Sequence, residues 1–338
     1  MHNRPSIKDI ARRADVAPST VSRALAGSTR VSAATRQRIE AIAAEMDYTP
    51  SAAARSLVTG ASKTLGILVP GLSDPYIAAV MEGIEASSAA AGYQHVIAST
   101  GGDPEREIRA VRMLAGYNPD GLIILSSRAG KAYLNILPTL NMPVAFVNSA
   151  QIGDSVLSIA TDNEHGGWLA TRHLLELGHK RIAYLGGPSR GRSQQARAAG
   201  YRRALHEAGI PFDPALLLAG DGSIDAGQAA LRHILSLPED VRPTAVFCYN
   251  DLCALGLLAH ARKHGLPVPE SLSVIGFDDI PIAAISAPPL TTIEQRTTEL
   301  GQLAVDSIFA ALRQEPVADI RLRGELIVRA STCTLSET

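Results

Sequence analysis

Val16-Ala17-Pro18-Ser19-Thr20-Val21-Ser22-Arg23-Ala24-Leu25 carries the clearest structural pattern in the N-terminal part of the chain. Pro18 suits the first turn of a helix, because proline lacks the backbone N–H that would be unpaired there. One side of this helix is apolar and consists of Val21, Ala24 and Leu25, after which Gly27 ends it. The other side is polar and carries Ser19, Thr20, Ser22 and Arg23. The stretch therefore predicts a short helix with one buried and one exposed side.

Two more helix patterns flank this one. In the first, Ser6 stands three residues before Asp9 as in a capping box, and the apolar residues that follow at helical spacing are Ile7, Ile10, Ala11 and Ala14. The second starts after Ser32, and the residues that we expect it to bury on one face are Ile39, Ile42, Ala43 and Met46. Three helices this short can bury one small core, which is the plan of a helix-turn-helix unit.

The charge of the chain is unevenly distributed. The overall formal charge is −1, yet residues 1–60 hold nine Lys/Arg against five Asp/Glu, a net charge of +4. The remaining residues hold 23 basic and 28 acidic side chains, a net charge of −5. A small basic head on an acidic body indicates that only the head binds a polyanion.

The polar side of the second helix suits the major groove of DNA. Arg23 can donate two hydrogen bonds to O6 and N7 of guanine, whereas hydroxyl groups and helix N-termini suit phosphates. The alternative is an ordinary amphipathic unit whose basic residues are only solvated. Arg36 is expected to contact phosphate. The predicted DNA contacts within the head are Lys8, Pro18, Ser19, Thr20, Ser22, Arg23 and Arg36.

Four segments of the head closely resemble the head of the LacI/GalR family of bacterial transcription regulators. They are Ile7-Lys8-Asp9-Ile10-Ala11, residues 16–25, Tyr48-Thr49-Pro50 and Ala54-Arg55-Ser56-Leu57. The resemblance implies that Ser19 and Arg23, with Pro18 at the helix start, occupy base-reading positions. Ala17 departs from the many relatives that carry a capping serine or threonine there, a loss of about 1 kcal/mol in helix stability.

Residues 51–58 have helix-forming composition but are too few to hold a helix alone in water. In the family that the chain resembles, two such hinge helices pair on the minor groove, and a leucine wedges between base pairs. Leu57 stands at that position, and Ala54 and Arg55 are predicted DNA contacts beside it. The alternative is a plain interdomain linker.

From Lys63 onward, short apolar runs alternate with helix patterns, as in doubly wound sheets. The strands expected in a first lobe are 65–69, 96–98, 121–124 and 144–147, and those expected in a second lobe are 182–185, 245–247 and 273–276. Two similar lobes in tandem leave a cleft between them. Open sheets bind ligands beyond the carboxyl ends of their strands, so the residues just after each strand are the informative ones.

Those positions carry carboxylates, amides, one arginine and an aromatic. The predicted effector-binding residues are Asp74, Tyr76, Asp162, Asn163, Ser193, Arg197, Asn250, Asp278 and Gln295. Such a set suits a polyhydroxylated ligand, because each sugar hydroxyl both donates and accepts a hydrogen bond. The alternative for each residue taken singly is a helix cap or a surface polar group. A sugar or sugar derivative is the predicted effector.

The family resemblance extends over this body, through Gly178-His179, Gly200-Tyr201, Asn250-Asp251, Gly276-Phe277-Asp278-Asp279 and Pro289-Leu290-Thr291-Thr292-Ile293. The body looks like the periplasmic sugar-binding fold, in which the arginine and aspartate matching Arg197 and Asp278 hold the ligand. Gly222 stands where several relatives place an aromatic that stacks on the ligand, which indicates a roomier pocket.

Other chemistries find little support. Cys248, Cys253 and Cys333 lack metal-knuckle spacing, and no nucleotide-binding glycine loop occurs, so neither a metal nor a cofactor is expected. Gly187-Pro188-Ser189-Arg190-Gly191 matches the nucleophile-elbow pattern, but the last histidine, His264, precedes the final strands. An enzyme that depends on Ser189 is therefore disfavoured. The absence of a signal peptide and of a long apolar run predicts a cytoplasmic location without membrane contact.

The sequence thus predicts a small all-α helix-turn-helix head with a hinge helix, followed by a two-lobed α/β domain of two doubly wound parallel sheets. The expected boundaries are 1–50 for the DNA-binding domain, 51–60 for the hinge and 61–338 for the effector and dimerisation domain, with an N-lobe of 62–160 plus 290–322 and a C-lobe of 161–289 plus 323–338. The predicted function is a homodimeric repressor that binds pseudo-palindromic operator DNA and responds to a small molecule. The competing hypothesis is a ligand-binding protein without regulatory DNA contact.

Overall fold

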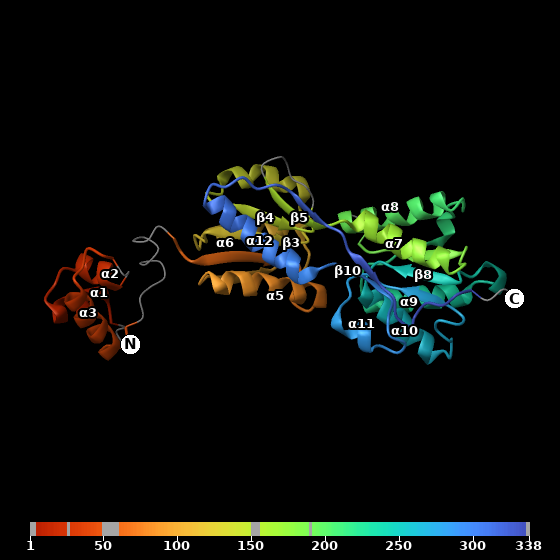
Figure 1. The fold of residues 1–338 in the computed structure, drawn as a ribbon, viewed down its shortest axis with the longest axis horizontal. Helices are drawn as coiled ribbons and strands as arrows, with labels where there is room; N and C mark the ends of the chain where they lie inside the picture. The colour runs from red at the N-terminus through yellow and green to blue at the C-terminus, as the bar shows by residue number, and fades with distance from the viewer. Residues whose placement is uncertain (1–4, 26–27, 49–60, 150–155, 189–190, 336–338) are drawn as a thin grey trace.

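The computed structural model describes residues 5–25, 28–48, 61–149, 156–188 and 191–335 (Figure 1). They form a helical head and a body of two α/β lobes that lie side by side along the long axis of the molecule. The predicted hinge, residues 51–60, and Gly27 and Ser189 lie outside the described residues. No helix among the described residues is long and apolar enough to span a membrane.

The head contains α1 (Ile7–Ala14), α2 (Pro18–Leu25) and α3 (Ala33–Glu45). The predicted capping box is present, because the backbone N–H and the hydroxyl of Ser6 both donate to Asp9 Oδ2, at 3.0 and 2.6 Å. Ser32 caps α3 as expected. The residues buried between the three helices are Ile10, Ala11, Ala14, Val21, Ala24, Val31, Ile39 and Ala43. Ile42 and Met46, also predicted for this core, are only half-buried at its edge.

The first lobe is built on a six-stranded parallel sheet in the order β11-β5-β4-β3-β1-β2. Its strands are β1 (Thr64–Val69), β2 (Gln94–Ser99), β3 (Gly121–Leu125), β4 (Val144–Val147), β5 (Leu157–Thr161) and β11 (Ile320–Leu322). Alternate residues of β1 serve the two faces: Leu65, Ile67 and Val69 pack with α5 (Pro75–Ala90) and α12 (Thr297–Leu312), and Leu68 packs toward α6 (Pro104–Ala115).

The helices α5 and α12 cross closely because glycines face each other's backbone. A Cβ on Gly83 would lie 1.9 Å from the carbonyl oxygen of Thr298, and one on Gly301 would lie 2.2 Å from that of Val80. Only glycine leaves room for this approach. The helix α12 is thereby held on the sheet of the first lobe, although it comes long after the strands β1 to β5 in the sequence (Figure 1).

The second lobe has a four-stranded parallel sheet in the order β7-β6-β8-β9. Its strands are β6 (Ile182–Leu185), β7 (Leu217–Leu218), β8 (Ala245–Cys248) and β9 (Ser273–Ile275). The helices α7 (Asn163–Glu176) and α8 (Arg192–Glu207) cover one face, α9 (Ile224–Ser236) and α10 (Asp251–Lys263) cover the other, and α11 (Pro281–Ile285) follows β9. Both sheets confirm the predicted parallel, doubly wound plan.

An antiparallel pair of strands, β10 (Thr292–Glu294) and β12 (Glu325–Ile327), lies where the chain passes between the lobes (Figure 1). Neither strand, nor β5, β7 or β11, was expected from the sequence. Each of these is five residues or fewer, and β11 and β12 hold residues that are mostly half-buried or exposed. Short strands of this kind carry little hydrophobic pattern.

His179 ties the C-terminal segment to the second lobe. Its side chain is 2% exposed; Nδ1 lies 3.0 Å from the hydroxyl of Thr244, and Nε2 lies 3.0 Å from that of Ser273 and 3.1 Å from the carbonyl oxygen of Cys333. Burial lowers the pKa of His179 from its ordinary value. The imidazole is therefore neutral in the folded protein near neutral pH.

We expect His179→Gln to reduce the loss of folding stability that the protein shows as the pH falls below neutral. A histidine whose folded-state pKa is lowered binds fewer protons folded than unfolded, so its contribution is complete above about pH 6.5 and declines as the pH falls below that value. Thermal unfolding between about pH 7.5 and 5.5 should thus show a smaller loss of Tm for the variant than for the wild type. The control is His206→Gln, at an exposed position on α8. Equal losses in all three proteins would contradict the expectation.

Candidate functional site

The exposed side of α2 carries the side chains predicted to read DNA. Pro18, Ser19 and Arg23 are exposed, whereas Thr20 and Ser22 are half-buried. The helix has no side-chain cap, since Ala17 supplies only its carbonyl oxygen, which accepts from the N–H of Thr20 at 2.8 Å. A free first turn with a hydroxyl and a guanidinium on one side can contact phosphate and base edges.

Two other predicted head contacts differ from each other in their surroundings. Lys8 on α1 is exposed. Arg36 on α3 is half-buried, and its guanidinium donates to the carbonyl oxygen of Ser28 at 2.7 Å, which joins α3 to the loop after α2. The hinge predictions Ala54, Arg55 and Leu57 lie outside the described residues.

A cavity of about 160 Å³ lies between the two lobes, at the carboxyl ends of their strands. Seven of the nine predicted effector residues line it: Asp74, Tyr76, Ser193, Arg197, Asn250, Asp278 and Gln295. They come from both lobes, because Asp74 and Tyr76 follow β1, whereas Ser193 and Arg197 lie on α8. The cavity can therefore contact one small molecule from two sides.

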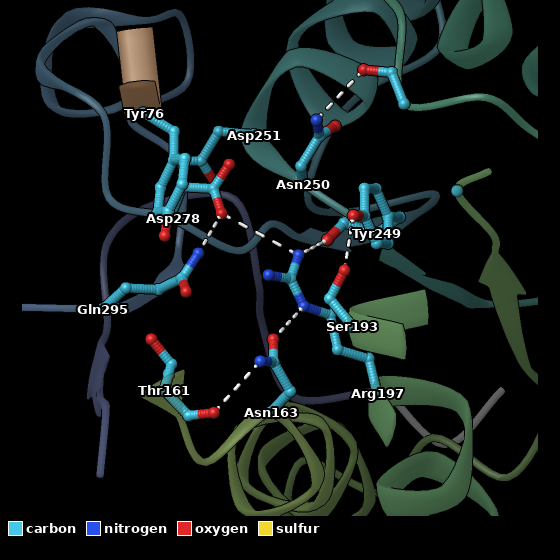
Figure 2. Close-up of polar contacts among 12 residues, drawn as sticks. Tyr76, Thr161, Asn163, Ser193, Arg197, Tyr249, Asn250, Asp251, Asp278 and Gln295 are labelled. Carbon is cyan, nitrogen blue, oxygen red and sulfur yellow. Dashed lines mark hydrogen bonds and ion pairs between the residues drawn. The ribbon is translucent and has the colours of Figure 1, made fainter. Parts of the chain in front are cut away.

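Arg197 lines this cavity and is at the centre of the polar contacts drawn in Figure 2. It is 4% exposed; its Nε donates to Asn163 Oδ1 at 2.8 Å, and its Nη1 donates to the carbonyl oxygen of Tyr249 and lies 3.8 Å from Asp278 Oδ1. Its guanidinium also lies 3.6 Å from the centre of the Phe277 ring. These contacts fix the direction of the charged group before any ligand arrives.

Asp278 is the buried acid that faces Arg197. It is 8% exposed, and Gln295 donates its side-chain N–H to Asp278 Oδ1. Burial raises the pKa of Asp278 well above its ordinary value, and the guanidinium of Arg197 opposes that rise. Burial also raises the pKa of Asp74, the N-cap of α5. Buried carboxylates of this kind are stabilised when the hydroxyl groups of a ligand donate hydrogen bonds in place of the lost water.

Asn148 joins residues of the first lobe to the crossing segment at the cavity. Its Nδ2 donates to the hydroxyl of Tyr76 and, at 3.4 Å, to Gln295 Oε1, while its Oδ1 accepts from the N–H of Thr161 at 2.7 Å. Burial raises the pKa of Tyr76, whose phenol stays protonated. The amide and the phenol together offer both donors and acceptors to a ligand.

The chain turns sharply where strands end at the cavity. Ser126 after β3, Asn148 after β4 and Asp278 after β9 have φ values of 50°, 47° and 128°. Residues other than glycine rarely adopt such values, and they persist where the surrounding structure enforces them. The strain lies at lining residues of the cavity, as is common at binding sites.

Asp162 and Asn163 do not line this cavity. Asp162 caps α7 by accepting from the N–H of His165 at 3.1 Å, and Asn163 orients Arg197. Both line an adjacent cavity of about 260 Å³, which shares Asn148, Arg192 and Ser193 with the first. The two cavities are thus neighbouring parts of one interlobe cleft.

Several lining residues were missed from the sequence, namely Ser126, Ser127, Arg128, Asn148, Asp221 and Tyr249. Three of the six follow a strand directly: Ser126 follows β3, Asn148 follows β4 and Tyr249 follows β8. The rule that ligands bind beyond the carboxyl ends of strands would have found these three.

Tyr249 lies beside the glycine that was expected to enlarge the pocket. Gly222 has a φ of 89°, and a Cβ there would lie 3.4 Å from the Tyr249 ring. The hydroxyl of Tyr249 lies 2.8 Å from that of Ser193 (Figure 2). Tyr249 therefore supplies an aromatic ring next to the position where Gly222 has none.

No group of three or more metal-ligating side chains occurs within the described ranges. The three cysteines are free. Asp251, beside the cavity, is fully buried; it accepts from the hydroxyl of Thr292 at 2.6 Å and from the N–H of Ile280 at 2.9 Å. Burial raises its pKa to about 6. Its bonds join α10 to the crossing segment and have a structural role.

Comparisons with known proteins agree with this architecture. Residues 6–51 match the model of bacterial regulatory proteins of the lacI family, and residues 171–332 match the periplasmic binding protein-like domain. The transcriptional repressor PurR of Aliivibrio fischeri is 36% identical over 92% of each chain. Two solved structures are similar over 97% of this chain: the lac repressor dimer bound to operator and the anti-inducer ONPF (99% of that chain, 29% identity, TM-score 0.85) and the regulator CelR with cellobiose (100%, 31%, 0.73).

A helix-turn-helix head joined to a two-lobed body with an interlobe cavity defines a ligand-responsive DNA-binding regulator. The chain belongs to the LacI family of bacterial regulatory proteins. It is a DNA-binding transcriptional repressor and not an enzyme, as the sequence predicted. The competing hypotheses of a binding protein without DNA contact and of a hydrolase that depends on Ser189 are set aside, because the full-length relatives are repressors.

Proposed function

We propose that the protein is a homodimeric repressor whose affinity for a pseudo-palindromic operator changes when a carbohydrate or carbohydrate derivative binds in the interlobe cavity. The observation that supports this ligand class is the buried ion pair of Arg197 and Asp278 in the lining of the cavity. A planar guanidinium and a carboxylate held in place suit neighbouring sugar hydroxyls, which accept from the one and donate to the other.

The surrounding residues support the same class of ligand. Amide groups of Asn148, Asn250 and Gln295 and the ring of Tyr249 line the cavity, which gives polar groups of both kinds beside an aromatic face. The similar regulator CelR binds cellobiose. The adjoining cavity, which shares Arg192 and Ser193 with the first, leaves space for a ligand longer than one sugar ring.

The roles of individual head residues form part of the proposal. Arg23 and Ser19 contact base edges, and Lys8 contacts phosphate, since all three are exposed. We assign residues 1–50 to DNA binding, 51–60 to the hinge and 61–338 to effector binding and dimerisation. Operator binding requires the protein to act in the cytoplasm, where we expect to find it.

The dimer contact is proposed to include α11. Ile282 and Ile285 on this helix are 49% and 81% exposed. This exposure is unusual, because the other isoleucines of the body are mainly buried. A second copy of the chain is the proposed occupant, because the similar lac repressor forms a dimer.

We expect Ile285→Asp to dissociate the dimer, because two like charges would face each other across a symmetric contact. Sedimentation equilibrium should show a dissociation constant raised by at least about tenfold, and operator affinity should fall with it. The matched control is Val241→Asp, at an isolated valine that is 37% exposed. An unchanged dimer in the α11 variant would remove this helix from the interface.

The proposed function as a whole is tested in two steps. Selection from random duplex DNA should recover a pseudo-palindrome that the protein binds in a salt-resistant complex. Native mass spectrometry of the purified protein, followed by a panel of mono- and disaccharides, should then identify a carbohydrate that shifts operator affinity. Failure to prefer any sequence, with or without these sugars, would overturn the proposal.

A further inference from the structure

The chain that leads from the head enters the body at a carboxylate. The N–H groups of Ser62 and Lys63 donate to the two oxygens of Asp120, at 2.7 and 3.0 Å, and the hydroxyl of Ser62 donates at 2.9 Å. Ser62 and Lys63 are among the first described residues after the predicted hinge. We call these three residues the Asp120 clamp. It holds two successive backbone groups and so fixes both the position and the direction of the entering chain.

The clamp is attached to three strands. The N–H of Asp120 donates to the carbonyl oxygen of Thr64 in β1 at 2.8 Å, and Asp120 itself precedes β3. The carbonyl oxygen of Lys63 accepts from Gln94, the first residue of β2, at 2.9 Å. Lys63 adopts the left-handed conformation with a φ of 51°. Such a conformation persists where neighbouring contacts enforce it.

Tyr93 closes the clamp from the side. Its ring lies 4.5 Å from Nζ of Lys63. Tyr93 is 8% exposed, and burial together with the charge of Asp120 raises the pKa of its phenol to about 12. The carboxylate is therefore satisfied on several sides and cannot easily change its partners.

The strands held by the clamp end at the effector cavity. After β1 come Pro70, Asp74 and Tyr76, and after β3 come residues 126–128, all of which line it. The two strands pair in register from Leu65 with Gly121 to Leu68 with Ile124, inside the sheet. A buried, hydrogen-bonded strand pair is one of the stiffest elements of a fold, so a displacement at one end is carried to the other.

We propose that Asp120 is a positioning residue, which makes the entering chain follow β1 and β3 and thereby sets the relative placement of the two DNA-reading heads in the dimer. The inference rests on the proposed function, namely a dimer that reads two half-sites. Asp120 contacts neither DNA nor effector; it acts through Ser62 and Lys63.

The test compares full-length wild type with Asp120→Ala on duplexes that carry two half-sites, recovered by selection with the wild type, at centre spacings varied in steps of one base pair. The wild type should bind one spacing best. For the variant, affinity at that spacing should fall about tenfold, and its advantage over the neighbouring spacings should largely disappear. Affinity for a duplex with a single half-site should stay unchanged, because α2 is intact.

The control is Asp103→Ala, which removes another capping carboxylate of the same lobe, bound to the N–H of Arg106 at 2.8 Å. Its spacing profile should match the wild type. Should Asp120→Ala fail to fold by thermal unfolding, Asp120→Asn, of the same size, replaces it. An unchanged spacing profile, or an equal loss on every duplex including the single half-site, overturns the role of Asp120. A wild type without any spacing preference overturns the proposed dimeric function instead, and this inference with it.

Discussion

Arg197→Ala is expected to lower the free energy of unfolding of the body by about 3 kcal/mol at neutral pH, because it leaves Asp278 buried without its cation. The loss should be smaller near pH 5. Burial already raises the pKa of Asp278, and without the guanidinium the pKa rises further, so the carboxyl group takes up a proton in the folded state as the pH falls. Denaturant unfolding followed by the fluorescence of Trp168, the only tryptophan, measures both effects, since α7 packs on α8.

The double variant Arg197→Ala/Asp278→Asn separates stability from binding. It removes the unpaired charge, so most of the lost stability should return and the pH dependence should flatten. In the double variant, operator affinity should not respond to the carbohydrate, because both ligand-facing groups are gone. A double variant that still responds to the sugar would exclude the pair from effector binding. Arg197→Lys is informative as well, since lysine cannot replace the planar guanidinium that bonds Asn163 and Tyr249.

Arg23→Ala is expected to lower affinity for the selected operator about 10- to 100-fold, the cost of losing one bidentate contact to a base. Affinity for random DNA should change little by comparison. Arg23 is exposed on α2, and its neighbours Val21 and Ala24 hold the helix in the core, so the substitution should leave the head folded. Titration of both duplexes at several salt concentrations, with circular dichroism as a folding check, measures the difference.

The comparison variant is Lys8→Ala. An exposed lysine that contacts phosphate should weaken binding to operator and random DNA alike and reduce the salt slope by about 1. Lys8 is preferable to Arg36 for this purpose. The guanidinium of Arg36 bonds the carbonyl oxygen of Ser28, so its removal would also disturb the head. Equal losses on the two DNAs for Arg23→Ala would exclude a base-reading role for Arg23.

Much of the cleft could be predicted from one rule. Residues that follow parallel strands meet at one edge of the sheet, and this placed Asp74, Asn250 and Asp278 correctly around the cavity. Asn148 and Tyr249 also follow strands and line the cavity, yet they were not among the predicted effector residues. Asp162, which follows β5, caps α7 and lines the adjoining cavity. A polar residue at a strand end can cap the next helix, line the cavity or do both, as Asp74 does, and the sequence does not distinguish these roles.

The head and the alternation of strands and helices in the body could be predicted from the sequence, because their causes are local. Ser6 and Asp9 close a capping box across one helical turn, and the apolar stripe of α2 lies within eight residues. Tertiary packing, by contrast, brings Arg197 to Asp278 and closes the Asp120 clamp on Ser62 and Lys63. These contacts join segments distant in the chain, and their geometry depends on how whole sheets and helices pack, which no short stretch of residues encodes.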